Sequence, residues 1–84
     1  TKPVLIIDDE PAITMALTPA LQSQGFEVCV APTASAGLTA AQDGVFSIVL
    51  LDLGLPDADG KDLIRPLRAL GPVSIIVLSA RHQE

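Results

Sequence analysis

The sequence lacks the features that mark membrane proteins and secreted proteins. No stretch of its 84 residues approaches the about eighteen consecutive apolar residues of a membrane-spanning helix, although 49% of the residues are hydrophobic. Cys29 is the only cysteine, so no internal disulfide can form, and no secretion-signal pattern opens the chain. We therefore expect a cytoplasmic protein that does not insert into a membrane.

Basic and aromatic residues are also scarce. Five basic residues against ten acidic ones give a formal net charge of −5. This balance argues against nucleic-acid binding by this segment, because a phosphate backbone selects basic surfaces. With two phenylalanines and neither tryptophan nor tyrosine, the core must consist of Val, Ile, Leu and Ala. The length predicts one small domain over residues 1–84, close to the lower size limit for a self-sufficient core.

Short apolar runs alternate along the chain with segments of helical spacing. The runs are rich in β-branched residues and occupy residues 4–7, 26–30, 48–51 and 74–78. Three of the four are continuous, which is typical of strands covered on both faces. Apolar residues recur three and four positions apart over residues 12–21, and more weakly over 38–41 and 63–70. The order βαβαβαβ predicts an α/β domain with a parallel sheet, right-handed crossovers and helices on both faces.

Proline, glycine and short polar residues mark the ends of the predicted helices. Pro11 suits the first turn of the first helix, and Gly25 follows its end. Thr33 or Ser35 can cap the second helix, and Asp59 can cap the third. This punctuation agrees with the limits that the apolar spacing predicts.

Three aspartates directly follow predicted strands. Asp8 and Asp9 come after the first apolar run, and Asp52 comes after the third. In an open parallel sheet, ligands bind outside the carboxyl ends of the strands, where the strand order reverses. If the strand order is 2-1-3-4, the first and third strands are neighbours at that point, and the three carboxylates converge. Two carboxylates ~4 Å apart repel by roughly 4 kcal/mol at an effective dielectric of 20, so a hard cation such as Mg²⁺ is favoured.

Each aspartate also has an ordinary structural explanation. Asp8 and Asp9 could end a strand and cap the helix behind Pro11, and Asp52 could be a loop residue, because loops favour aspartate. The presence of all three at adjoining strand ends favours a metal site over these explanations. The pattern by itself does not name a reaction.

Three motifs, in order, resemble the receiver domain of bacterial two-component response regulators. They are VLIIDDEP at residues 4–11, LLDLGLPDADG at 50–60 and VLSA at 77–80. The details DLGLP at 52–56 and LSAR at 78–81 resemble the OmpR/PhoB subfamily, and most closely its potassium-responsive KdpE type. The resemblance implies a flavodoxin-like (CheY-like), doubly wound parallel sheet with the strand order 2-1-3-4.

The resemblance also implies a role for each candidate site residue. Asp52 would be the nucleophile that accepts phosphate from a phosphohistidine of a partner histidine kinase. Asp9, Asp52 and the backbone carbonyl of Gly54 would bind Mg²⁺ directly, and Asp8 would act mostly through water. Ser79 would hydrogen-bond the phosphoryl group and shift toward it as a switch. Such a domain is a phosphoacceptor that controls a transcriptional output domain, rather than an enzyme with a separate substrate.

Compared with that family, the sequence stops early. A receiver domain continues through a fourth helix, a fifth strand and a fifth helix, and the fifth strand carries an active-site lysine; here no lysine follows Lys61. We expect an incomplete domain with impaired phosphorylation. The strand at residues 74–78 would then form an uncharged, unprotected edge, so we also expect a homodimer or higher assembly through that edge.

Three other functions fit parts of the pattern. A flavodoxin-like cofactor binder would need a Ser/Thr/Gly-rich phosphate loop after the first strand, where this chain has the acidic residues 8–10. An aspartyl-nucleophile phosphatase would need a second acid two residues after the nucleophile, where Gly54 stands. A receiver-like interaction module without phosphoryl turnover remains an alternative for an incomplete domain.

Overall fold

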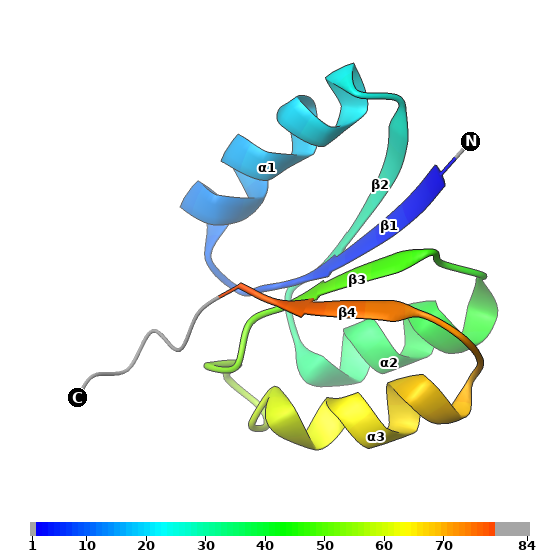
Figure 1. Ribbon diagram of the computed structural model, residues 1–84. Helices are drawn as coiled ribbons and strands as arrows, with labels where there is room; N and C mark the ends of the chain where they lie inside the picture. The colour runs from blue at the N-terminus through cyan, green and yellow to red at the C-terminus, as the bar shows by residue number, and fades with distance from the viewer. Residues whose placement is uncertain (1, 79–84) are drawn as a thin grey trace.

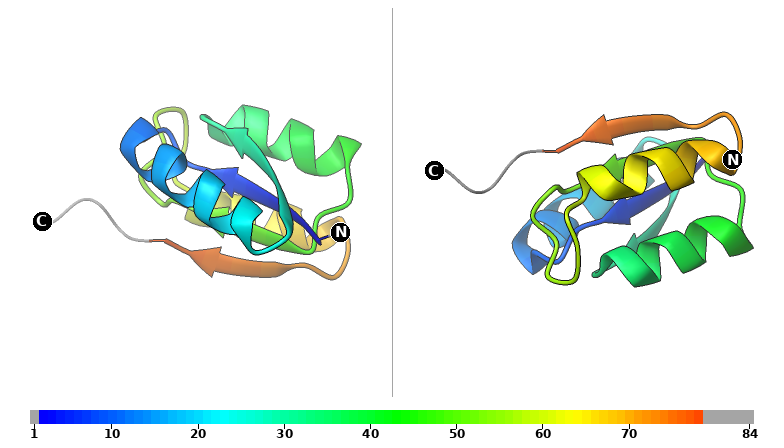
Figure 2. Two further views of the ribbon diagram at one scale, coloured as in Figure 1. Left: turned by 90° about the horizontal axis from the view of Figure 1, so that it is seen from above. Right: turned by 90° about the horizontal axis from the view of Figure 1, so that it is seen from below.

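The computed structural model describes residues 2–78, in which the apolar runs form a parallel sheet and the segments of helical spacing form three helices (Figure 1). The elements are β1 (Lys2–Ile7), α1 (Pro11–Ser23), β2 (Phe26–Ala31), α2 (Ala34–Asp43), β3 (Ile48–Leu51), α3 (Lys61–Ala69) and β4 (Ser74–Val77). The strand order is β2-β1-β3-β4. Helix α1 covers one face of the sheet, whereas α2 and α3 cover the other (Figures 1 and 2). The predicted α/β class and strand order are therefore confirmed.

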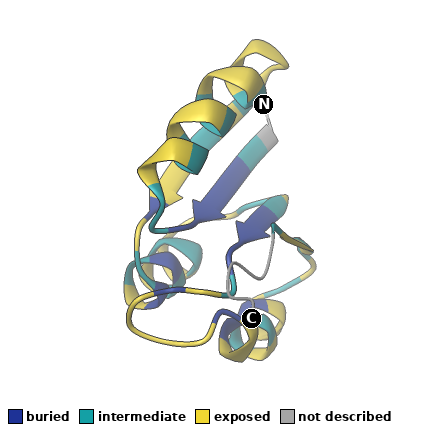
Figure 3. Cartoon of the chain, turned by 90° about the vertical axis from the view of Figure 1, so that its left-hand side faces the viewer, coloured by how far each residue is buried: buried dark blue, intermediate teal, exposed yellow. Residues whose placement is uncertain are grey.

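The two central strands, β1 and β3, are buried from both faces. In β1, Leu5 and Ile7 pack in the cluster beneath α2 and α3, whereas Val4 and Ile6 pack in the cluster beneath α1. All four side chains are at most 1% exposed, and burying each of them contributes about 1.5–3 kcal/mol. Figure 3 shows β1 as a band of buried residues through the middle of the molecule. The continuous apolar patterns of these strands thus predicted their environment correctly.

The prediction that a continuous apolar run forms a strand covered on both faces is wrong for β4. Ile76 is 50% exposed and Val77 is 44% exposed, although the strand lies in a continuous apolar run. Within residues 2–78, β4 is the outermost strand on its side of the sheet. Helix α1 lies above β1 and β2 at the other side (Figure 1), so it cannot cover the second face of β4.

The helix ends follow the predicted punctuation, with one exception. Pro11 is the first residue of α1, and the Thr33 side chain accepts a hydrogen bond from the Ala36 N–H at 3.0 Å, so it caps α2. The prediction that Asp59 caps α3 is wrong, because Gly60 occupies the N-cap position and no side chain caps it. The backbone of Asp59 instead pairs with Gly54 in an isolated antiparallel bridge.

Helix α2 packs directly on the end of β1 through a glycine. A β-carbon built at Gly37 would lie 2.6–2.9 Å from three side-chain atoms of Ile7, closer than real β-carbons approach such atoms. Only a glycine therefore allows the helix backbone to reach this depth. Since Ile7 immediately precedes Asp8 and Asp9, this contact ties the position of α2 to the strand end that carries two of the candidate site residues.

Candidate metal centre

The sheet itself places Asp8 and Asp52 side by side. Strands β1 and β3 are neighbours with Ile7 opposite Leu51, and each strand is followed directly by an aspartate. The parallel ladder continues past the strand ends: the Asp52 N–H donates to the Ile7 carbonyl at 2.9 Å, and the Asp8 N–H donates to the Ala31 carbonyl at 3.0 Å. The backbone of both aspartates is therefore held by sheet hydrogen bonds.

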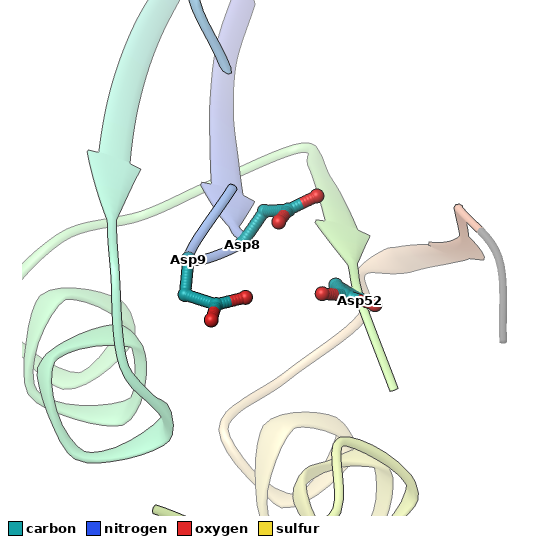
Figure 4. A group of neighbouring side chains, drawn as sticks. All are labelled: Asp8, Asp9 and Asp52. Carbon is teal, nitrogen blue, oxygen red and sulfur yellow. The ribbon is translucent and has the colours of Figure 1, made fainter. Parts of the chain in front are cut away.

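The three candidate carboxylates converge as predicted. One oxygen each from Asp8, Asp9 and Asp52 lies within 4.8 Å of the other two. Figure 4 shows the side chains extending from the ends of β1 and β3 into the same space. Asp8 is 2% exposed and Asp52 is 1% exposed, while Asp9 is half-buried. The predicted convergence of the three carboxylates is confirmed, and two of the three are buried.

Local hydrogen bonds orient the two buried carboxylates. The Glu10 N–H donates to Asp8 Oδ1 at 2.8 Å, and the Gly54 N–H donates to Asp52 Oδ1 at 3.1 Å. Each aspartate thus holds the backbone two residues ahead, in the manner of an Asx turn. The alternative in which Asp8 or Asp9 caps α1 is not supported, because Glu10 occupies the N-cap position and no side-chain hydrogen bond caps the helix.

This donor set fits a hard divalent cation. Two unit negative charges 4.8 Å apart repel by roughly 3 kcal/mol at an effective dielectric of 20, and a cation between them reverses the sign of that contribution. Mg²⁺ takes oxygen ligands at about 2.0–2.1 Å, so opposite ligands lie roughly 4.2 Å apart. Three carboxylate oxygens within 4.8 Å of one another are therefore close enough to approach one octahedral ion that also keeps water ligands.

Gly60 also forms part of the site, a role that the sequence does not indicate. Its N–H donates to the Leu53 carbonyl at 2.9 Å, and a β-carbon built on it would collide with the Asp52 carbonyl oxygen. The loop of residues 53–60 is thus closed at its base directly beside Asp52. No pattern in the sequence reveals this approach, because it depends on how the loop returns to the strand end.

The sequence also gives no indication of the role of Asp57. Its two carboxylate oxygens accept hydrogen bonds from the Ala34 N–H at 2.8 Å and from the Ser35 N–H at 3.0 Å. The first of these bonds, and then the second, lower the pKa of Asp57 below its ordinary value of 3.8. The loop after β3 is therefore fastened to the start of α2, which lies more than twenty residues earlier in the chain.

The stability that Asp57 contributes should depend on pH. Because its pKa is lower in the folded protein, its contribution is complete above the unfolded pKa near 3.8 and disappears as pH falls through the lower folded value. We expect Asp57→Ala to be less stable than the unmodified protein at neutral pH, with the difference shrinking below about pH 4. Urea unfolding of both proteins across this range measures it. A difference that stays constant down to low pH would contradict the assignment.

The remaining predicted site residues have different outcomes. Gly54 lies beside the acidic cluster, with its N–H bonded to Asp52. Ser79 lies outside the described residues.

Comparisons with known proteins agree with this geometry. The family model of the response regulator receiver domain matches residues 4–84. The KDP operon transcriptional regulatory protein KdpE of Escherichia coli is 47% identical over 96% of this chain and 36% of its own length. A response regulator of Burkholderia pseudomallei, solved with a phosphorylated aspartic acid, a calcium ion and citrate, superposes with a TM-score of 0.86 at 32% identity, covering 92% of this chain and 46% of that one.

A third similar protein comes from the structure of histidine kinase ThkA in complex with response regulator TrrA. The matched chain gives a TM-score of 0.87 at 30% identity, over 99% of this chain and 72% of that one. The present chain spans only about a third of the length of the KdpE regulators that it matches.

Proposed function

Because the chain belongs to the response regulator receiver domain family, we propose that Asp52 is the phosphoacceptor of a two-component signalling pathway. The observation that carries this proposal is the convergence of Asp8, Asp9 and Asp52 within 4.8 Å at the adjoining ends of β1 and β3. A related response regulator that contains a phosphorylated aspartic acid supports it.

In the proposed reaction, a carboxylate oxygen of Asp52 attacks the phosphorus of a phosphohistidine on a histidine kinase. A bond forms between oxygen and phosphorus, the phosphorus–nitrogen bond breaks, and its electron pair returns to the imidazole. The sheet hydrogen bond at the Asp52 N–H and the Gly54 N–H at Oδ1 hold the nucleophile in one orientation. Catalysis of such a transfer is mainly positioning and electrostatics, which suits a buried and immobilised carboxylate.

Asp9, Asp52 and the Gly54 carbonyl would hold a Mg²⁺ ion directly, and Asp8 would act through water. The ion, when bound, offsets negative charge on the transferring phosphoryl group. The contribution of the chain is to supply oxygen ligands on two separate segments, after β1 and after β3, each of which sheet hydrogen bonds hold at Asp8 or Asp52. Ser79 would contact the phosphoryl group after transfer and act as the hydroxyl switch.

Magnesium is expected to stabilise the protein through these acids. At ten times the dissociation constant, Mg²⁺ should raise the free energy of unfolding by about 1.4 kcal/mol, by mass action. The double variant Asp9→Asn/Asp52→Asn should show little or no gain, because it loses two of the charged ligands. Urea unfolding with and without Mg²⁺ measures the effect, with Asp43→Asn as a control for an exposed acid at the end of α2. Equal stabilisation of the double variant would remove the metal assignment.

The partners follow from the same function. We propose a histidine kinase as the phosphodonor, supported by the similar chain from a kinase–regulator complex. We also propose a DNA-binding output domain elsewhere in the protein, supported by the transcriptional regulators that match this chain.

Within residues 2–78, no helix combines the length and hydrophobicity needed to cross a membrane. We propose that the protein acts in the cytoplasm and that this segment does not itself bind nucleic acid, since its net charge is −5.

We also propose that β4 takes part in self-association. Its half-exposed Ile76 and Val77 lie on a strand that is outermost among the described ones, and exposed apolar strands at a sheet edge favour pairing with another chain. We expect Ile76→Lys to shift the chain of residues 1–84 from dimer or higher assembly toward monomer, as measured by sedimentation at tens of micromolar. A chain that is already a monomer before substitution would contradict this proposal.

A further inference from the structure

The loop of residues 53–60 is fixed at its base, beside the acidic cluster. Gly54 pairs with Asp59, and the Gly60 N–H bonds the Leu53 carbonyl at 2.9 Å. The Gly54 N–H in turn reaches Asp52 Oδ1 at 3.1 Å. A displacement of the whole loop would therefore displace the backbone around Gly54, next to Asp52.

The exposed side of the same loop is fixed by Asp57. Its carboxylate receives the Ala34 and Ser35 N–H groups, which are the first two of α2. The first N–H groups of a helix have no partner inside the helix, and the positive end of the helix dipole favours a carboxylate there. Thr33 satisfies a third such group, at Ala36. Asp57 and Thr33 thus together accept the first three N–H groups of α2. Of these two residues, only Asp57 belongs to the loop after β3.

Helix α2 links this contact to the other half of the site. Gly37 brings the helix onto Ile7 with no space for a β-carbon, and Ile7 leads directly into Asp8 and Asp9. A continuous series of contacts therefore runs from Asp57 through α2 to the end of β1. It relates the position of the loop that carries Gly54 to the position of the acids on β1.

We propose that Asp57 is a positioning residue for the metal site: by fastening the loop of residues 53–60 to α2, it sets the position of Gly54 relative to Asp8 and Asp9. The inference rests on the proposed function, in which Mg²⁺ binds among these residues. Asp57 itself touches neither the cluster nor the reacting atoms, and it acts through the loop. The competing explanation is that Asp57 only caps α2 and stabilises the fold.

Three alanine variants separate these explanations. Asp57→Ala removes both the loop–helix contact and one negative charge. Asp59→Ala removes one negative charge from the same loop, where the Asp59 side chain is exposed. Thr33→Ala removes a cap from the same end of α2 without touching the loop. The loss of a group that hydrogen-bonds a metal ligand typically weakens metal affinity 10- to 100-fold. Asp57 acts one step further away, through the loop, so we expect Asp57→Ala to raise the Mg²⁺ dissociation constant by the lower limit of that range, about tenfold. The two controls should change it less than about twofold.

A second readout does not require the metal. In Mg²⁺-free protein, amide hydrogen exchange at Gly54 and Gly60 should become about tenfold faster in Asp57→Ala and remain unchanged in Thr33→Ala, because only the first variant frees the loop. Unchanged exchange in Asp57→Ala would overturn the proposal, as would a loss of Mg²⁺ affinity in Thr33→Ala or Asp59→Ala equal to that in Asp57→Ala. A further outcome is that the unmodified protein binds no Mg²⁺ while Asp57→Ala still accelerates amide exchange at Gly54 and Gly60. In that case the proposed metal function fails, and the positioning role fails with it, whereas the loop–helix contact stands.

Discussion

Replacing Asp52 by alanine is expected to abolish labelling of the protein by a small phosphodonor. Acetyl phosphate with Mg²⁺ should phosphorylate the unmodified whole protein at Asp52 alone, giving an adduct that is stable in acid and labile in alkali, as acyl phosphates are. Without the carboxylate there is no nucleophile, and the loss of a nucleophile costs more than about 10³-fold in rate at comparable sites. Incorporation should therefore fall below detection.

Two further variants make this experiment specific. Asp52→Asn preserves the shape of the side chain but removes its nucleophilic charge, and it should be as inactive as Asp52→Ala. Asp43→Ala removes an exposed acid at the end of α2, at the opposite end of that helix from the site, and it should be labelled normally. Labelling that persists in Asp52→Ala, or that maps to Ser79, would remove the central claim. No labelling of the unmodified protein would instead favour a receiver-like interaction module without phosphoryl turnover.

Gly60→Ala is expected to have the largest effect on stability among the glycine variants. The residue has φ −57° and ψ −32°, a conformation open to alanine, so no backbone strain arises. The added β-carbon would, however, collide with the Asp52 carbonyl oxygen and lie 2.7 Å from the Leu53 α-carbon. Both neighbours are backbone atoms that cannot rotate away. We expect the free energy of unfolding to fall by about 3 kcal/mol, the upper part of the range for overpacking. The Mg²⁺ affinity should also fall, because the collision displaces the strand end that carries Asp52.

Gly25→Ala is the matched control for this experiment. Gly25 has φ +91° and no atom within 4 Å of a built β-carbon, so alanine there meets conformational strain but no collision. The expected cost is about 1–2 kcal/mol, with unchanged Mg²⁺ affinity, because the residue lies between α1 and β2, away from the site. Urea unfolding and Mg²⁺ titration of both variants test the distinction. A Gly60→Ala protein with unaltered stability and Mg²⁺ affinity would show that the loop base is not rigid.

The candidate site was predictable from the sequence because it follows from topology. In a parallel sheet of order 2-1-3-4, the residues that follow the two central strands lie next to one another at the carboxyl ends of the strands, and this topology brings Asp8, Asp9 and Asp52 together. Where the prediction failed, a distant neighbour decided the outcome. Asp59 looked like a helix cap, but its backbone bridges to Gly54, and β4 looked doubly covered, but α1 lies over the other side of the sheet (Figure 1).

Periodicity and punctuation in the sequence determined the kind of each element and the parallel sheet, because these depend on local backbone preference and on the handedness of crossovers. The strand order 2-1-3-4, and with it the convergence of the three acids, is what the resemblance to receiver domains implies. Only the tertiary structure decided that Gly60 touches the backbone of Asp52 and that Asp57 bonds the start of α2. Both are contacts whose geometry depends on how a loop folds back in space. Residue order carries no signal for such a contact, since the partners of Asp57 lie more than twenty positions away and offer only backbone N–H groups, which every residue other than proline possesses.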